Sequence, residues 1–335
     1  PGTERQQGMQ GFEDKYVDIV DYIVRITHRI WEEKDVGYIY DTYSHTSKVH
    51  DDIGLQYGRD KIVADTIHTI NAFPDIRLFA DEIVWAGDDQ VGFDTSHRTV
   101  IVGHNTGYSR YGPPTGRKVT CWCVANCKIL ANEIFEEWVI YDTASLIHQL
   151  GFSLRDKARE FGNQLGKGVP RSMRFGDSER ALGQRKPPLM PLGHRGGFDV
   201  AEFIEVTYHN IWNRRMLATV REAYVPGLRF RGSTNRVYHD RGEYQSFILS
   251  ILAMFPDLAL KVDDVYWMGN DMDGYRTSVR WSIVGTHRGM GIYGRPTGRQ
   301  VSMWGISQHK ISGGKIIDEL MLFNEFAVMQ QIYRD

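Results

Sequence analysis

An aspartate near the middle of the chain, Asp142, stands where an acid/base catalyst could work. It ends an apolar stretch, Ile134 to Asp142, that is typical of a β-strand. Because alternate residues of a strand share a face, Asp142 is expected to share one with Ile140 and Trp138, among apolar walls. Such walls move the pKa of a carboxyl group toward neutrality, where it can take and release a proton. The alternative is that Asp142 caps the helix that follows it, since aspartate is favoured at helix starts.

Histidines and aromatic residues in the same half of the chain could assist this carboxylate. His50 and His104 are candidate partners in proton transfer, although His50 can equally be a hydrogen-bonded interior residue. Tyr40 and Trp138 are candidate substrate-binding residues. Trp122 either packs in the core or offers a stacking platform to a ligand.

Three cysteines, Cys121, Cys123 and Cys127, lie close together in the sequence. Their odd number and tight spacing do not fit a secreted disulfide framework. A zinc site would need a fourth ligand and usually a two-residue gap between paired cysteines. We therefore expect buried thiols and no bound metal.

Composition narrows the class of protein. A chain of 335 residues with 41% hydrophobic content suits two ordinary domains better than one. The formal net charge of −2 lacks the basic excess of nucleic-acid-binding proteins, so no nucleic-acid partner is expected. No long apolar run and no leader-like N-terminus is present, which predicts a soluble, cytoplasmic protein without a membrane partner.

The sequence repeats itself at an offset of about 182 residues. Phe73-Pro74-Asp75 matches Phe255-Pro256-Asp257, and Pro114-Thr115-Gly116 matches Pro296-Thr297-Gly298. We therefore expect one domain over residues 1–152 and a second copy over residues 197–335.

The segment between the copies, residues 153–196, is rich in arginine and lysine and ends in prolines. A short helix is predicted over residues 155–164, followed by an extended strap. Its arginines could hold an anionic substrate, or the segment could be a solvated basic linker.

Within each copy, helices are predicted first and strands after. Helices are expected over Tyr16–Trp31, Asp60–Ala72 and Thr143–Leu150, and strands over Ile76–Trp85, Gln90–Val102, Arg117–Ile129 and Ile134–Asp142. This pattern predicts an α+β fold of two tandem cone-shaped domains, each a curved antiparallel sheet packed on N-terminal helices. The open end of such a cone is the expected place for a small-molecule substrate.

The motifs together resemble those of the SnoaL-like polyketide cyclases, in the nuclear transport factor 2-like superfamily. The first copy carries Trp138-x-x-x-Asp142 and Gln149-Leu150-Gly151, and the second carries Gly285-Thr286-His287 before its Pro-Thr-Gly. The resemblance implies acid/base chemistry without a cofactor, in which a carboxylate and an imidazole assist an intramolecular aldol closure.

The two residues that the resemblance makes catalytic lie in different copies. Asp142 matches the family carboxylate, and His287 matches the family imidazole. The second copy has Asn324 where the first has Asp142, and the first has Asn105 where the second has His287. Asn105 and Asn324 are therefore expected to bind substrate rather than to move protons.

Two hypotheses follow. The first is a cofactor-independent lyase, isomerase or aldol-type cyclase acting on a small carbonyl compound, aromatic or polyketide-like, through Asp142 with His50 or His104, and through His287 in the second copy. The second is a non-catalytic ligand-binding protein. Domains of this family pair through their sheets, so either hypothesis implies an intramolecular pseudo-dimer, with further homo-oligomerisation left open.

Overall fold

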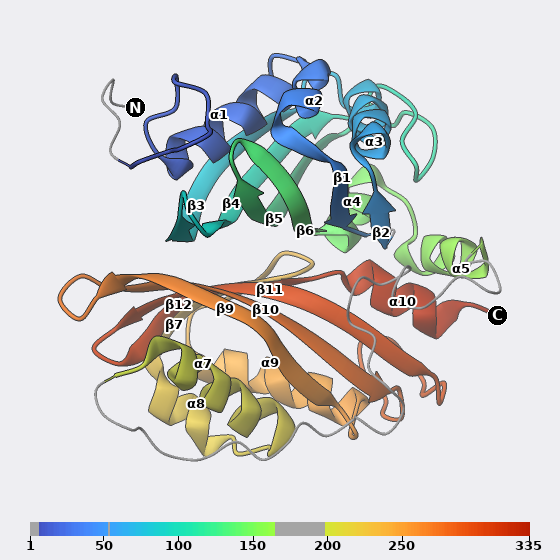
Figure 1. The fold of residues 1–335 in the computed structure, drawn as a ribbon. Helices are drawn as coiled ribbons and strands as arrows, with labels where there is room; N and C mark the ends of the chain where they lie inside the picture. The colour runs from blue at the N-terminus through green and yellow to red at the C-terminus, as the bar shows by residue number, and fades with distance from the viewer. Residues whose placement is uncertain (1–6, 53, 165–197) are drawn as a thin grey trace. The chain divides into compact units, whose positions relative to one another are not determined.

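The structure, a computed structural model, describes residues 7–52, 54–164 and 198–335. The chain divides into two compact units, Pro1–Lys157 and Ala158–Asp335, and each contains one six-stranded sheet (Figure 1). In each unit the helices from the N-terminal part lie on one face of the sheet. The predicted α+β fold with two tandem domains is therefore confirmed.

The first unit contains four helices, a 3₁₀ turn and six strands, and a fifth helix, α5, crosses its boundary with the second unit. They are α1 (Ile19–Trp31), a 3₁₀ turn (Val36–Tyr38), α2 (Ile39–Thr42), β1 (Tyr43–His50), β2 (Leu55–Tyr57), α3 (Arg59–Ala72), β3 (Arg77–Asp88), β4 (Gly92–His104), β5 (Lys118–Leu130), β6 (Glu133–Tyr141), α4 (Thr143–Leu150) and α5 (Leu154–Gln164). The helix expected over residues 155–164 is α5, which continues into the second unit. The rest of the basic segment, residues 165–196, lies outside the described residues.

The sheet order in this unit is β2-β1-β6-β5-β4-β3. The four predicted strands form the antiparallel run β3 to β6. Strand β1 adds to this run by pairing parallel to β6, with Val49 opposite Glu137 and His50 opposite Trp138. The sequence analysis missed β1 and β2 because these segments are mostly polar and lack the apolar alternation of a half-buried strand.

Local sequence explains where the two long helices begin and end. The Asp18 carboxylate accepts a hydrogen bond of 2.7 Å from the backbone N–H of Asp21 and so caps α1. The apolar stripe of α1, which includes Ile23 and Ile26, is buried against the sheet. Helix α3 ends at Ala72, two residues before Pro74, which cannot continue a helix.

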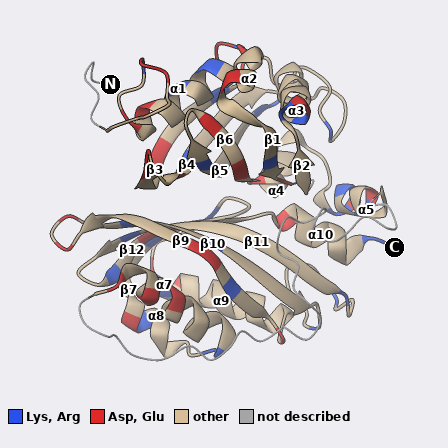
Figure 2. Ribbon diagram, in the orientation of Figure 1, with Lys and Arg blue, Asp and Glu red and all other residues tan. Residues whose placement is uncertain are grey.

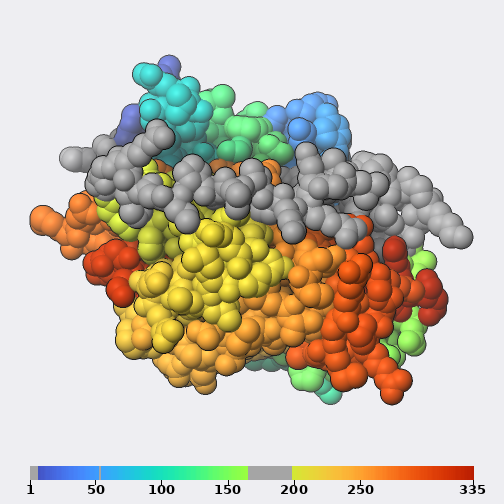
Figure 3. Space-filling model, turned by 90° about the horizontal axis from the view of Figure 1, so that it is seen from below, coloured from blue at the N-terminus to red at the C-terminus, as the bar shows by residue number. Residues whose placement is uncertain are grey.

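The second unit repeats this arrangement. It contains α7 (Val200–Tyr208), a π-helical turn (His209–Asn213), α8 (Ala218–Ala223), β7 (Tyr224–Gly232), β8 (Arg236–Tyr238), α9 (Arg241–Met254), β9 (Ala259–Asn270), β10 (Gly274–Thr286), β11 (Gln300–Ser312), β12 (Lys315–Phe323) and α10 (Glu325–Tyr333). The sheet order is β8-β7-β12-β11-β10-β9, again with one parallel pair, β7 and β12. Figure 3 looks onto the helical face of this unit, where α7 to α9 appear in yellow and light orange.

The Pro-Thr-Gly turns have the mechanical role that their sequence suggests. Gly116 and Gly298 close these turns with φ values of 68° and 70°. Residues with a Cβ rarely adopt this left-handed region, whereas glycine does so without strain. The turns therefore set the start of β5 and β11, the central strands of the two sheets.

Candidate functional site

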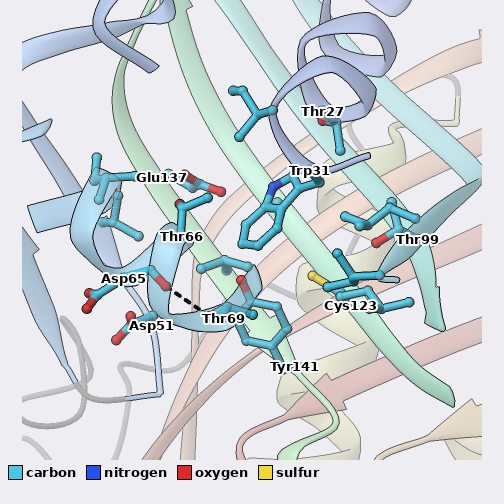
Figure 4. Close-up of a pocket in the computed structure, with 18 of the residues that line it drawn as sticks. Thr27, Trp31, Asp51, Asp65, Thr66, Thr69, Thr99, Cys123, Glu137 and Tyr141 are labelled. Carbon is cyan, nitrogen blue, oxygen red and sulfur yellow. Dashed lines mark hydrogen bonds between the residues drawn. The ribbon is translucent and has the colours of Figure 1, made fainter. Parts of the chain in front are cut away.

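The first unit contains a cavity of about 220 Å³, partly open to solvent, between its helices and the concave face of its sheet. Figure 4 looks into this cavity, with Trp31 from α1, Thr66 from α3, Thr99 from β4, Cys123 from β5 and Glu137 from β6 around it. Its apolar walls come from helix and strand residues, among them Ile23, Ile26, Ile30, Ile62, Ile101 and Val139. A largely apolar cavity with a few polar groups is typical of a small-molecule site.

Glu137 brings a carboxyl group of raised pKa to this cavity. Its side chain is 9% exposed and lines the cavity together with Val139 and Tyr141 of the same strand. The hydroxyl of Tyr43 donates a hydrogen bond of 3.0 Å to Glu137 Oε2. Burial raises the pKa of Glu137 to about 7, although the Tyr43 hydrogen bond opposes this rise. Near neutral pH the group is therefore present both as an acid and as a base.

Strand β6 differs from its neighbour in charge. Figure 2 marks the acidic residues of β6, whereas β5 has charged residues only at Lys118 and Lys128, near its ends. Because side chains alternate along β6, Glu137 faces the cavity and Glu136 faces the other side of the sheet, toward His50. Only one of the two adjacent carboxylates therefore reaches the cavity.

A second carboxyl group, Asp52, lines the same cavity. Thr143 Oγ1 donates a hydrogen bond to Asp52 Oδ2. Burial raises the pKa of Asp52 to about 7, and the nearby charges of Asp51 and Asp142 add to this rise. Arg110, also in the lining, supplies the opposing positive charge.

His97 brings an imidazole to the cavity from β4. It is 5% exposed, and burial lowers its pKa to about 4, so the ring is neutral at physiological pH. Its neighbours in the lining include the thiols of Cys123 and Cys127. Burial raises the pKa of both thiols, which makes them poor nucleophiles.

The corresponding positions in the second unit carry larger or apolar residues. Thr27 is replaced by Tyr208, Ile62 by Tyr244, Asp65 by Phe247, His97 by Val279 and Thr99 by Trp281. Tyr208 and Tyr244 are 0% exposed, and Trp281 is 1% exposed.

Two of these differences between the units are coupled by packing. The position of Cys123 is Gly305 in the second unit, where an added Cβ would lie 2.2 Å from the Trp281 ring. The indole thus occupies space that a cysteine side chain would need. The same backbone encloses a cavity in the first unit and packs aromatic rings at the corresponding positions of the second.

The counterpart of Glu137 in the second unit is Glu319, which is 0% exposed. It accepts a hydrogen bond of 2.9 Å from the Tyr208 hydroxyl, and its Oε1 lies 3.4 Å from His309 Nε2. The other nitrogen of His309, Nδ1, lies 2.8 Å from Thr277 Oγ1. The second carboxylate is therefore held in a side-chain network within the packed interior.

The structure places Asp142 beside the cavity but not in its lining. It is 1% exposed and follows β6, between Tyr141 and Thr143, which both line the cavity. The expectation from strand alternation, that the face of β6 with Trp138 and Ile140 meets the site, differs from the structure. The cavity lies on the opposite face, which carries Glu137. Asp142 occupies the N-terminal position of α4, yet its side chain makes no capping hydrogen bond there.

His50 and Trp138 come together on the other face of the sheet. Their rings stack with centroids 5.1 Å apart and an interplanar angle of 4°. His50 Nε2 lies 3.2 Å from Glu136 Oε1. His104 is exposed at the end of β4 and pairs with Asp75, its Nδ1 lying 2.6 Å from Asp75 Oδ2. None of these side chains lines the cavity.

The remaining predicted site residues hold local structure. Tyr40 is 44% exposed and donates a hydrogen bond to Asp60. Asn105 is buried, and its side chain bonds to the backbone of Ala72, Gly107 and Thr115. Asn324 caps α10 by accepting a hydrogen bond of 2.8 Å from the Ala327 N–H. His287, in the second unit, is buried beside Thr297 and Phe255, and Trp122 lies on β5 outside the cavity lining.

The sequence analysis missed Glu137, Asp52 and His97. Glu137 leaves a signal in the repeat, because it corresponds to Glu319 and its hydrogen-bond donor Tyr43 corresponds to Tyr224. A glutamate and a tyrosine that both recur at matching positions of the two copies would have indicated a buried pair. His97 has no such signal, since its counterpart is a valine.

The described residues hold no group of three or more His, Cys, Asp and Glu side chains that could bind a metal ion. The three cysteines are free and buried. No helix in the described ranges has the length and apolar character needed to span a membrane.

Comparison with known proteins adds a family assignment. The family model described as SnoaL-like polyketide cyclase matches residues 21–150 and again residues 204–332. No curated protein matches the chain.

Among solved structures, the chain is similar to a candidate SnoaL-like polyketide cyclase from Jannaschia sp. CCS1, with 19% identity over 43% of this chain and 99% of that chain, at a TM-score of 0.36. It is also similar to IdmH, a candidate polyketide cyclase from Streptomyces antibioticus, with 20% identity over 39% and 97% of the two chains, at a TM-score of 0.34. A third, from Bacillus cereus, has 15% identity over 46% and 94%, at a TM-score of 0.35.

Proposed function

The chain belongs to the SnoaL-like polyketide cyclase family, and from this premise we propose that its first unit is a cofactor-independent acid/base catalyst. The reaction is a lyase, isomerase or aldol-type cyclase step on a small carbonyl compound. The observation that carries the proposal is a buried carboxyl group, Glu137, with a pKa of about 7 in a mostly apolar cavity.

The chemistry assigned to Glu137 is proton transfer next to a carbonyl group. As a carboxylate, it takes a proton from the carbon beside the carbonyl, and the C–H electron pair then forms the enolate. Glu137 afterwards returns the proton to another position of the substrate or to the product of ring closure. A pKa near the working pH suits both steps, since neither protonation state is rare.

Tyr43 supports this role by holding the carboxyl group in place. Its hydroxyl bonds one carboxyl oxygen, Oε2, which leaves Oε1 to face the substrate. Asp52 and Arg110 lie in the same lining and contribute a second carboxyl group and a positive charge. Asp142, next to this lining, acts through its negative charge, which helps to raise the pKa of Asp52.

Hydrogen–deuterium exchange at carbon tests the proposal without knowledge of the natural substrate. The protein is incubated with 2-tetralone in D₂O, and loss of the protons beside the carbonyl is followed by NMR. We expect catalysed exchange that falls at least a hundredfold in Glu137→Gln, the lower range for loss of general acid/base catalysis. Glu136→Gln, a change of the adjacent carboxylate on the other face, is the matched control and should retain activity.

The same experiment distinguishes the alternative function. If 2-tetralone binds, as shown by saturable changes in its NMR line widths, but exchanges no faster than in buffer, the cavity is a binding site and not a catalytic one. Equal exchange rates in Glu137→Gln and the parent protein would remove Glu137 from the mechanism.

A further inference from the structure

His97 lies at a boundary between two spaces of the first unit. It lines the inner cavity, and it also lines a groove between the outer side of α1 and strand β3. Thr27 and Leu78 line both spaces as well. The imidazole thus lies between the cavity and this groove.

The buried imidazole nitrogen Nε2 has no hydrogen-bond partner among the described residues. The side chain is only 5% exposed, so bulk water does not replace the missing partner. A buried polar atom without a partner opposes folding, and native proteins usually provide one. The second unit has Val279 at this position in the same fold, fully buried, so the fold itself does not require an imidazole.

The sheet register places His97 at a useful separation from Glu137. His97 lies opposite Ala125 of β5, and Ala125 lies opposite Val139 of β6, one inward-facing position from Glu137. Two inter-strand spacings of about 4.8 Å across the sheet, combined with two residues of about 3.3 Å along the strand, put the Cα atoms of His97 and Glu137 about 12 Å apart. Both side chains extend into the cavity, which leaves room between them for one ring with its substituents.

We propose that His97 is a substrate-positioning residue whose Nε2–H donates a hydrogen bond to the carbonyl oxygen of a ring-bearing ketone held against Glu137. The inference rests on the proposed function and adds the substrate class to it. The cavity, at about 220 Å³, suits one or two rings, since an engineered apolar cavity of about 150 Å³ holds benzene. A four-ring polyketide would not fit inside it.

The role of His97 follows from how the charge moves. When Glu137 removes the proton, the C–H electron pair becomes the enolate double bond, and the carbonyl π pair moves onto oxygen. The Nε2–H donates to this oxygen more strongly as its negative charge grows. No proton leaves His97, because the ring stays neutral and acts only as a hydrogen-bond donor.

A pair of isosteric ligands tests the hydrogen bond apart from catalysis. Acetophenone has the carbonyl oxygen, and α-methylstyrene has a CH₂ group in its place. The dissociation constants of both are measured by NMR titration with the full chain and with His97→Val and His97→Gln. We expect the preference for acetophenone, corrected for partition between water and cyclohexane, to fall about fivefold in His97→Val.

The variants separate positioning from stability. His97→Val copies the residue of the second unit and should fold at least as well as the parent, and His97→Gln keeps an N–H donor and should restore part of the preference. An unchanged preference in His97→Val, or no binding of either ligand by the parent, would overturn the proposal. The two proposals can fail separately. If the parent protein prefers acetophenone as expected but does not catalyse hydrogen–deuterium exchange of 2-tetralone, the catalytic role of Glu137 is refuted and the assignment of His97 stands.

Discussion

Replacement of Glu137 by glutamine should stabilise the first unit in a pH-dependent way. In the folded protein the carboxyl has a pKa of about 7, against an ordinary value of 4.5. Below pH 4.5 the group is protonated in both states and contributes no difference. Between pH 4.5 and 7 the unfolded chain releases this proton and the folded unit keeps it, so stability falls as pH rises and stays low above pH 7.

The shift corresponds to about 3 kcal/mol of lost stability at pH 8. A neutral glutamine fills the same space, can accept the Tyr43 hydrogen bond and does not titrate. The difference in free energy of unfolding between Glu137→Gln and the parent should therefore be small at pH 4.5 and should grow by about 3 kcal/mol at pH 8. The pH dependence due to Asp52 is common to both proteins and cancels.

Native-state hydrogen exchange read by mass spectrometry can measure this difference for peptides of β4 to β6, apart from the second unit. Glu136→Gln, which removes the same charge from the other face of β6, is the control and should lack the growing difference. If the stability of Glu137→Gln relative to the parent is the same at pH 4.5 and pH 8, the carboxyl is not held in a desolvated cavity and its assignment as a proton-transfer group loses its basis.

Three further changes probe the cavity and the packing of the second unit. The double variant Thr99→Trp with Cys123→Gly transfers the packing of the second unit to the first and should abolish ketone binding in NMR titrations while the protein stays folded by circular dichroism. Tyr43→Phe removes a hydrogen bond that lowers the pKa of Glu137, so the pH profile of carbon exchange should move up by about one pH unit; an unmoved profile would contradict the contact. Arg236→Ala breaks an ion pair between the part-buried Arg236 and the buried Glu325, whose two N–O distances are 2.7 and 2.8 Å, and should lower the unfolding free energy of the second unit by about 3 kcal/mol in urea titrations; a change below 1 kcal/mol would show that water reaches the Glu325 carboxylate.

The fold could be predicted from the sequence because its strongest signals are local. Helix α4 has the predicted bounds Thr143–Leu150, and α3 differs from its prediction by one residue at its start. The order of helices and strands followed from the internal repeat and from the spacing of apolar residues, which changes within each copy from the helical pattern to the alternation of strands. The parallel pairing of β1 with β6 could not be predicted, since it depends on a contact between segments far apart in sequence and β1 is mostly polar.

The candidate site was harder to predict because β6 carries both apolar residues and a glutamate on each face. Ile140 and Trp138 mark one face as buried, and Val139 and Tyr141 mark the other, so alternation alone does not say which face meets a cavity. The choice depends on what covers each face, which is a tertiary property. His97 illustrates the same limit, because a single histidine in a strand gives no sign of its burial or of its missing partner.

The first unit keeps a cavity of about 220 Å³ where the second unit packs side chains. The second unit shows that this fold can place Trp281, Tyr244 and Phe247 in the corresponding space, so the cavity is not imposed by the backbone. The first unit also keeps two carboxyl groups of raised pKa and a neutral imidazole there, and each of these opposes folding. The proposed function is consistent with this arrangement, because a small carbonyl ligand in the cavity supplies hydrogen-bond partners to these polar groups.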